Sequence, residues 1–250
     1  MARTRVLISA ALVAVMAAGV FHFGRADHVK TETQALNARR YAASRLPVIN
    51  AHLQQASAGY VLWAGDSNAE LFQPPALPCG REVVNAGVSG ATTDVYAEVA
   101  EKLESARGHA AVLTIGTNNL LSKKRPLDPA AVDRFERDVS RIIDALRARA
   151  DTVVVTAIPP VQDMEAGVVN TDAVQAYSQR LEAICDRGRC AYEDPFAAVR
   201  AKAFGIARPG ASVGIHLEDY RASLEPLLER ICAESPSEAS GHRPSPGGSG

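Results

Sequence analysis

The chain reads Tyr60-Val61-Leu62-Trp63-Ala64-Gly65-Asp66-Ser67 where an apolar run gives way to a glycine and two polar residues. A short apolar run that is bounded by turn residues is typical of a buried strand. Asp66 and Ser67 are good caps for a helix that follows. Because a strand that leads into a helix is the repeating unit of α/β proteins, this stretch predicts the first strand of such a domain.

Four further strand-like runs follow along the chain, and helical patterns alternate with them. The runs are 83–85, 110–115, 152–157 and 190–192, and the helical patterns cover about 93–106, 129–146, 171–185 and 219–232. This alternation predicts an α/β fold with a parallel five-stranded sheet and helices on both faces. In such sheets, ligands bind beyond the carboxyl ends of the strands.

Residues suited to acyl transfer follow three of these strands. Ser67 stands at the start of a helix, where free N–H groups and a partial positive charge stabilise an alkoxide. Gly90 lets the backbone approach a ligand closely, so that its N–H can face an oxyanion, and Asn118 can donate from its amide. His216, ahead of the last helix, is expected to be the general base that takes the Ser67 proton.

Each of these residues has an ordinary structural explanation when it is taken alone. Ser67 can simply cap a helix, Gly90 can be a turn glycine, and Asn118 can stabilise a turn. A lone histidine is more often structural than catalytic. Their occurrence in this order on one scaffold favours a nucleophile, oxyanion donors and a base at one edge of a sheet.

The arrangement resembles the SGNH hydrolases, the superfamily that contains the GDSL esterases and lipases. Gly65-Asp66-Ser67 matches the first block and Ser89-Gly90 the second. Gly116-Thr117-Asn118-Asn119 matches the third, with Asn119 in place of the commoner aspartate. The resemblance covers roughly 60–232. It implies a flavodoxin-like three-layer sandwich that hydrolyses carboxylic esters, with the N–H groups of Ser67 and Gly90 and the Asn118 amide as oxyanion hole. No metal or organic cofactor is implied.

The fourth block departs from the family pattern, which is Asp-x-x-His. This chain reads Val213-Gly214-Ile215-His216, so Val213 replaces the aspartate that orients the imidazole and stabilises its charged form. A backbone carbonyl is the favoured substitute, which gives a Ser67–His216 dyad. Glu218 or Asp219 folding back, or Asp194 from a neighbouring loop, are the other substitutes.

Three functions remain open, and the missing aspartate is the feature that supports the second of them. An exported esterase that works through the dyad is the main interpretation. A protein of the same fold that only binds an acylated glycan is the second, and an acyltransferase that acts on a sugar hydroxyl is the third. We expect the partner to be a small-molecule or glycan ester, and the chain to be a monomer.

Composition excludes nucleic acid as a partner. The 250 residues are 47% hydrophobic and 22% charged, with a net charge of −1 and 5% aromatic residues. A nucleic-acid-binding protein has a basic face and often aromatic residues for base stacking. The length and apolar content suit one globular core.

The two ends of the chain are predicted to lie outside the domain. Arg3 and Arg5 precede an uncharged apolar stretch over 6–23, which predicts a signal anchor over 1–26, with a cleaved signal peptide as the alternative. The protein would then be periplasmic or otherwise extracytoplasmic, held at the inner membrane. Residues 27–58 are predicted as a polar helical stalk, 59–234 as the hydrolase-like domain, and 235–250 as a disordered tail.

The four cysteines suit an exported chain, because an even count there indicates disulfides. Cys185 and Cys190 flank a polar turn and can close a small loop. Cys79 and Cys232 would then pair by elimination. Buried thiols or metal ligands are the alternative, and the absence of a C-x-x-C pair argues against a metal.

Overall fold

The structure is a computed structural model that describes residues 36–75 and 80–233. The chain divides into two units, Met1–Arg40 and Tyr41–Gly250. The predicted signal anchor, the predicted disordered tail and Cys79 lie outside the described residues. No helix in the described part is both long and apolar enough to span a bilayer.

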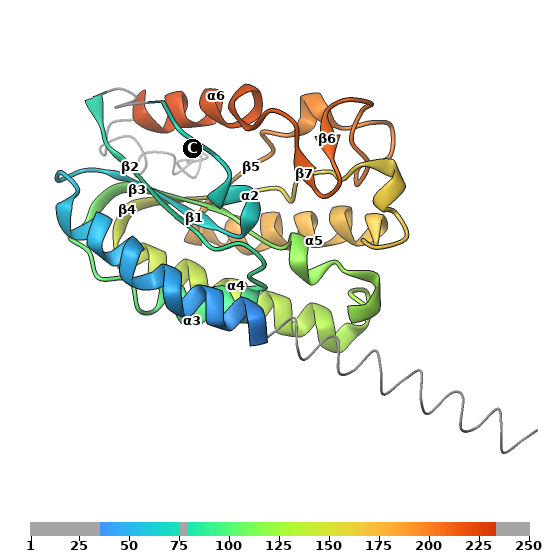
Figure 1. The fold of residues 1–250 in the computed structure, drawn as a ribbon, viewed down its shortest axis with the longest axis horizontal. Coiled ribbons are helices and arrows are strands. Elements are labelled where there is room, and N and C mark those ends of the chain that lie inside the picture. The colour runs from blue at the N-terminus through green and yellow to red at the C-terminus, as the bar shows by residue number, and fades with distance from the viewer. Residues whose placement is uncertain (1–35, 76–79, 234–250) are drawn as a thin grey trace, which may run out of the picture. The chain divides into compact units, whose positions relative to one another are not determined.

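Five parallel strands form the central sheet, in the order β2-β1-β3-β4-β5 (Figure 1). They are β1 Val61–Gly65, β2 Val83–Gly87, β3 Gly108–Thr114, β4 Ala150–Thr156 and β5 Ala191–Glu193. The central strands β1 and β3 are buried along their whole length, which explains why apolar residues fill β1 and most of β3. The predicted parallel sheet is therefore confirmed.

Helices cover both faces of this sheet, as predicted (Figure 1). On one face α4 packs against α3 and α5. On the other, α6 buries leucines against alternate residues of the central strands, such as Trp63 and Val112. The helices are α2 Ser67–Glu70, α3 Thr93–Ala100, α4 Pro129–Arg147, α5 Thr171–Ile184 and α6 Tyr220–Ala233.

The helix α3 is shorter than predicted, because it ends at Ala100 rather than near 106. Beyond that point, side chains of other elements take the backbone groups that a longer helix would use. Asn50 donates to the Lys102 carbonyl at 3.2 Å and accepts from the Glu104 N–H at 3.0 Å. Arg149 donates to the Leu103 carbonyl at 2.8 Å. Tertiary contacts thus override the helical periodicity of the sequence.

A helix over 36–55 precedes the sheet in the sequence. From Tyr41 onward it belongs to the same unit as the sheet. Ala42, Ile49 and Leu53 are buried, and their spacing places them along one stripe of the helix. This stripe packs the helix onto the domain and brings its polar residues close to the end of β2.

The turn between α5 and β5 contains a disulfide. Cys185 and Cys190 form it as predicted, with their Cα atoms 4.6 Å apart. Cys232 is disulfide-bonded as well. Since Cys79 lies outside the described residues, the pairing of Cys79 with Cys232 stays a prediction.

Candidate active site

Ser67 is the first residue of α2 and lies two residues beyond the end of β1. The backbone turns sharply at Gly65, where φ is 141°. A Cβ atom at this position would lie 1.8 Å from the carbonyl oxygen of Thr114, so only glycine fits between the strands. This tight turn places the Ser67 side chain at the carboxyl edge of the sheet, where the sequence predicted it.

Asp66 is fully buried and connects the first block to the third. Its Oδ1 accepts from the Asn68 N–H at 2.9 Å, which caps α2. Its Oδ2 accepts from the N–H groups of Gly116 and Thr117 at 3.1 and 3.2 Å. Burial raises the pKa of Asp66 to about 6, although these hydrogen bonds favour the charged form. One carboxyl group thereby fixes the Gly116 turn relative to Ser67.

His216 is brought to Ser67 from the far end of the chain. Its Nε2 lies 2.9 Å from the Ser67 Oγ, and 149 positions separate the two residues in sequence. Burial lowers the pKa of His216, because desolvation disfavours the imidazolium ion. The ring is therefore held in the neutral form that can accept a proton, within the distance that general-base catalysis requires.

A two-stranded hairpin carries His216, and the sequence interpretation missed it. The strands β6 Ser212–Val213 and β7 His216–Leu217 pair antiparallel, and Gly214 in their turn has a φ of 62°. Gln162 holds this turn twice. Its side-chain Oε1 accepts from the Gly214 N–H, and its own backbone N–H donates to the Gly214 carbonyl, both at 2.9 Å. A lone glutamine in a loop carries no signal of this role in the sequence.

Val213 lies directly opposite His216 across this hairpin and is 63% exposed. Directly opposed residues of an antiparallel pair project on the same face, so an apolar side chain stands beside the imidazole. Among the described residues, no carbonyl or carboxylate accepts a hydrogen bond from Nδ1 of His216. The favoured backbone acceptor is therefore not found in this part of the chain.

The two predicted aspartate substitutes are engaged elsewhere. Asp219 caps α6, because its Oδ1 accepts from the N–H groups of Arg221 and Ala222 at 2.9 and 3.1 Å. Asp194 accepts two hydrogen bonds from Arg200, at 2.9 and 3.0 Å. Both carboxylates thus have structural tasks away from His216. Glu218, the third carboxylate considered, has no hydrogen bond to His216 either.

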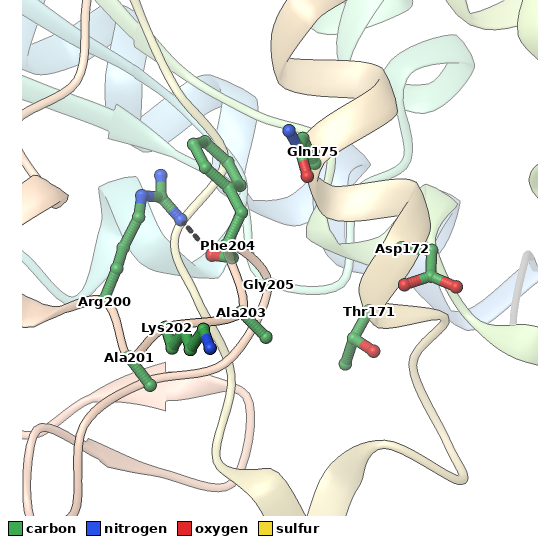
Figure 2. Close-up of a pocket in the computed structure, with 9 residues that line it drawn as sticks. All are labelled: Thr171, Asp172, Gln175, Arg200, Ala201, Lys202, Ala203, Phe204 and Gly205. Carbon is green, nitrogen blue, oxygen red and sulfur yellow. Dashed lines mark hydrogen bonds between the residues drawn. The ribbon is translucent and has the colours of Figure 1, made fainter.

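Arg200 borders a separate pocket of about 380 Å³ between the loop 200–205 and the start of α5 (Figure 2). Its guanidinium donates to the Phe204 carbonyl at 2.8 Å and lies 3.7 Å from the centroid of the Phe204 ring. The Arg200 side chain is 6% exposed, so its charge needs Asp194 as a partner. The residues that line this pocket include none of the four blocks, and we assign it no catalytic role.

The second and third blocks meet at the same edge of the sheet. Gly90 lies in the turn after β2 with a φ of 76°, and Asn118 donates from Nδ2 to the Ala91 carbonyl at 3.2 Å. The Val88 N–H donates to the Gly65 carbonyl at 2.9 Å, which joins the second block to the first. The N–H groups of Ser67 and Gly90 make no hydrogen bond with another described residue. They remain available to a ligand.

Asn119 has a structural task. Its Oδ1 accepts from the Thr93 N–H and its Nδ2 donates to the Thr93 hydroxyl, both at 3.0 Å. It thereby ties the third block to the start of α3. Aspartate is the commoner residue at this position in the family that the chain resembles. An aspartate could accept from the same N–H but could not donate.

Lys124 supports the third block and was missed by the sequence interpretation. Its Nζ donates to the backbone carbonyl of Asn118 at 2.9 Å, and burial lowers the pKa of the ammonium group. A lysine after a turn gives no sign in the sequence that it folds back in this way.

Comparison with known proteins identifies the family of this chain. Residues 55–220 match the model of the GDSL-like lipase/acylhydrolase family. The chain belongs to this family. The predicted membership of the SGNH superfamily is thus confirmed, and ester hydrolysis is the general activity of such a hydrolase.

Solved structures show the same fold at low sequence identity. A Streptococcus pneumonia protein, provisionally described as a platelet activating factor, is 18% identical with a TM-score of 0.65, covering 80% of this chain and 98% of its own. A GDSL-like lipase from Bacteroides thetaiotaomicron is 18% identical with a TM-score of 0.59, covering 78% of this chain and 97% of its own. The M. smegmatis aryl esterase is 16% identical with a TM-score of 0.52, covering 69% of this chain and 97% of its own. Comparison with curated proteins finds no match.

Proposed function

We propose that this GDSL-like hydrolase is a serine esterase in which Ser67 is the nucleophile and His216 the general base. The 2.9 Å contact between the Ser67 Oγ and the His216 Nε2 carries the proposal. A serine hydroxyl is a weak nucleophile unless a base lies within hydrogen-bonding distance. Both residues stand where the family's blocks lie, at the edge of the sheet that ligands approach.

The reaction follows from these positions. The Ser67 oxygen attacks the acyl carbon while His216 takes the hydroxyl proton, and the carbonyl π electrons move onto oxygen. The N–H groups of Ser67 and Gly90 and the Asn118 amide stabilise that oxyanion. His216 then gives its proton to the departing alkoxide, which leaves an acyl-enzyme. Water repeats the sequence, releases the carboxylic acid and restores Ser67.

The base works in this proposal as part of a dyad, without a carboxylate. Val213 cannot accept a hydrogen bond, and the burial that lowers the pKa of His216 also disfavours the imidazolium formed during attack. We therefore expect slow turnover for a member of this family. The same feature supports the second candidate, a protein that binds an acyl ester without hydrolysing it.

We also propose that the hydrolase domain lies outside the cytoplasm, anchored by the segment over 1–26. The apolar stretch after Arg3 and Arg5 and the Cys185–Cys190 disulfide support this placement, since disulfides persist in oxidising compartments. Cell fractionation with N-terminal sequencing of the mature protein tests it. A soluble cytoplasmic chain that retains Met1 contradicts the placement.

A fluorophosphonate probe, followed by turnover of a chromogenic acetyl ester, tests the esterase. We expect Ser67→Ala to abolish both labelling and turnover, while Ser57→Ala, at an exposed serine outside the blocks, matches the parent. Turnover that survives in Ser67→Ala contradicts the assignment of the nucleophile. A folded parent that binds esters but shows neither labelling nor turnover supports the binding protein. Acyl-sugar products formed with an added acceptor would identify a transferase.

A further inference from the structure

We propose that Glu70 and Arg45 are positioning residues that hold the second block, so that the Gly90 N–H faces the oxyanion. This inference rests on the proposed function, because it assigns a task to the surroundings of Gly90. Neither residue is expected to touch the substrate. They form a clamp, defined here as Arg45, Glu70 and the backbone of 85–89.

Glu70 connects the nucleophile's helix to the second block. It is the last residue of α2, three positions after Ser67. Its Oε2 accepts a hydrogen bond from the Ser89 N–H at 2.5 Å. Ser89 immediately precedes Gly90, so this bond fixes the peptide next to the proposed oxyanion donor. A hydrogen bond to a carboxylate is stronger than one between neutral groups, which suits a contact that must set geometry.

Arg45 approaches the same segment from the helix over 36–55. Its Nη2 donates to the Asn85 carbonyl at 3.1 Å, and its Nε donates to the Gly87 carbonyl at 3.4 Å. Its Nε also lies 3.6 Å from the Glu70 Oε1, which in turn accepts from the Tyr41 hydroxyl. One guanidinium therefore holds both the end of β2 and the carboxylate that holds Ser89.

The positive charge of Arg45 also offsets the negative charge of Glu70 near the site. The two side chains are 18% and 19% exposed, so solvent screens Glu70 only in part. The Glu70 carboxylate is bound to Ser89, the residue next to Gly90. Without a positive partner, its charge would repel the negative charge that develops in the transition state. Arg45 makes the clamp electrically neutral. Glu70 can therefore hold the second block in place without repelling the oxyanion.

Arg45 and Tyr41 lie outside the part of the chain that matches the family, which begins at 55. The helix over 36–55 thus contributes to the site from outside the shared domain. The motif blocks reveal Ser67 and Gly90, but they contain no information about a partner that precedes them by more than twenty residues. The clamp is therefore a property of this chain that the blocks do not imply.

Steady-state kinetics with the chromogenic acetyl ester test the clamp in the full-length protein. We expect Arg45→Ala and Glu70→Ala to lower kcat by about 10- to 100-fold, with KM within about twofold of the parent. The reason is that an oxyanion donor acts in the transition state and not on the bound ester. Glu70→Gln, whose amide oxygen still accepts from Ser89, and Arg45→Lys should retain more activity than the alanine variants. Arg40→Ala, at an exposed arginine of the same helix, should match the parent.

Amide hydrogen exchange over 85–90 supplies a readout that does not depend on turnover. We expect faster exchange there in the alanine variants than in the parent. An unchanged kcat, or a loss confined to KM, overturns the positioning role, and so does unchanged exchange. If an alanine variant fails to fold, the same criteria apply to Glu70→Gln and Arg45→Lys. A parent without Ser67-dependent turnover contradicts the proposed function instead, and the exchange data keep the two failures apart.

Discussion

At the scale of single residues, Val213 leaves the His216 imidazole without a carboxylate beside it. It lies directly opposite His216 in the hairpin, so Val213→Asp would place a carboxylate beside the imidazole. We expect kcat to rise about tenfold, which corresponds to ~1.4 kcal/mol of barrier, because the imidazolium formed during attack gains a charged partner. The acid limb of the profile of kcat/KM against pH should also move to higher pH.

The direction in which the acid limb moves follows from the pKa of His216. Burial holds the pKa of His216 below its ordinary 6.5, so the parent should remain active at mildly acidic pH. A neighbouring carboxylate stabilises the imidazolium and raises that pKa. Val213→Asn, which has no charge, is the matched control and should leave the acid limb in place. If Val213→Asp folds but changes neither kcat nor the acid limb, another group already orients the imidazole.

Replacing Asp66 should change both the stability and the activity of the protein. In Asp66→Asn, one carboxylate oxygen becomes an NH₂ group that faces N–H donors, and each unsatisfied donor costs about 1–3 kcal/mol. We expect a lower Tm and a large loss of activity, because the first and third blocks separate.

The amount by which Asp66→Asn lowers the Tm should depend on pH. The folded pKa of Asp66 is about 6, above its ordinary value, so its contribution to the unfolding free energy of the parent is lost as pH rises through 6. The variant lacks this titration. The difference in Tm between parent and Asp66→Asn should therefore narrow from pH 5 to pH 7. A difference that stays constant over this range would show that Asp66 is already ionised in the folded protein well below pH 6.

At the scale of elements, the Cys185–Cys190 disulfide stabilises the turn that leads into the edge strand β5. The chain-entropy model gives about 2 kcal/mol for so short a loop. We expect the double variant Cys185→Ser, Cys190→Ser to unfold at a lower denaturant concentration than the parent. Its kcat/KM should be unchanged, because β5 carries none of the four blocks. A loss of activity in folded protein would indicate that the edge strand influences the site.

The hairpin that carries His216 shows which elements sequence reasoning fails to find. Its two strands have two residues each, which is too short for any period to be visible. Its position depends on Gln162, a loop residue that follows a different strand. The sequence motif therefore points to His216, whereas the hairpin that carries this residue was visible only in three dimensions.

At the scale of the whole molecule, the sheet was predictable because its central strands β1 and β3 are buried on both faces. That burial requires uninterrupted apolar runs, and such runs can be read from the sequence alone. The positions of Ser67, Gly90 and Asn118 followed from the same logic, since each comes just after a strand. Arg45 and Lys124 were not predictable, because a long side chain acts on backbone that the sequence does not identify as its neighbour.

The wide separation of Ser67 and His216 has a consequence for the timing of synthesis. A ribosome completes Ser67, the proposed nucleophile, 149 residues before His216, the proposed base. At about 5–20 residues per second, the two are made roughly 7–30 s apart. Throughout that interval the nascent chain contains Ser67 without the base proposed for it, so the proposed reaction cannot begin. On the proposed mechanism, activity begins only after His216 has been made, which delays it relative to the synthesis of Ser67.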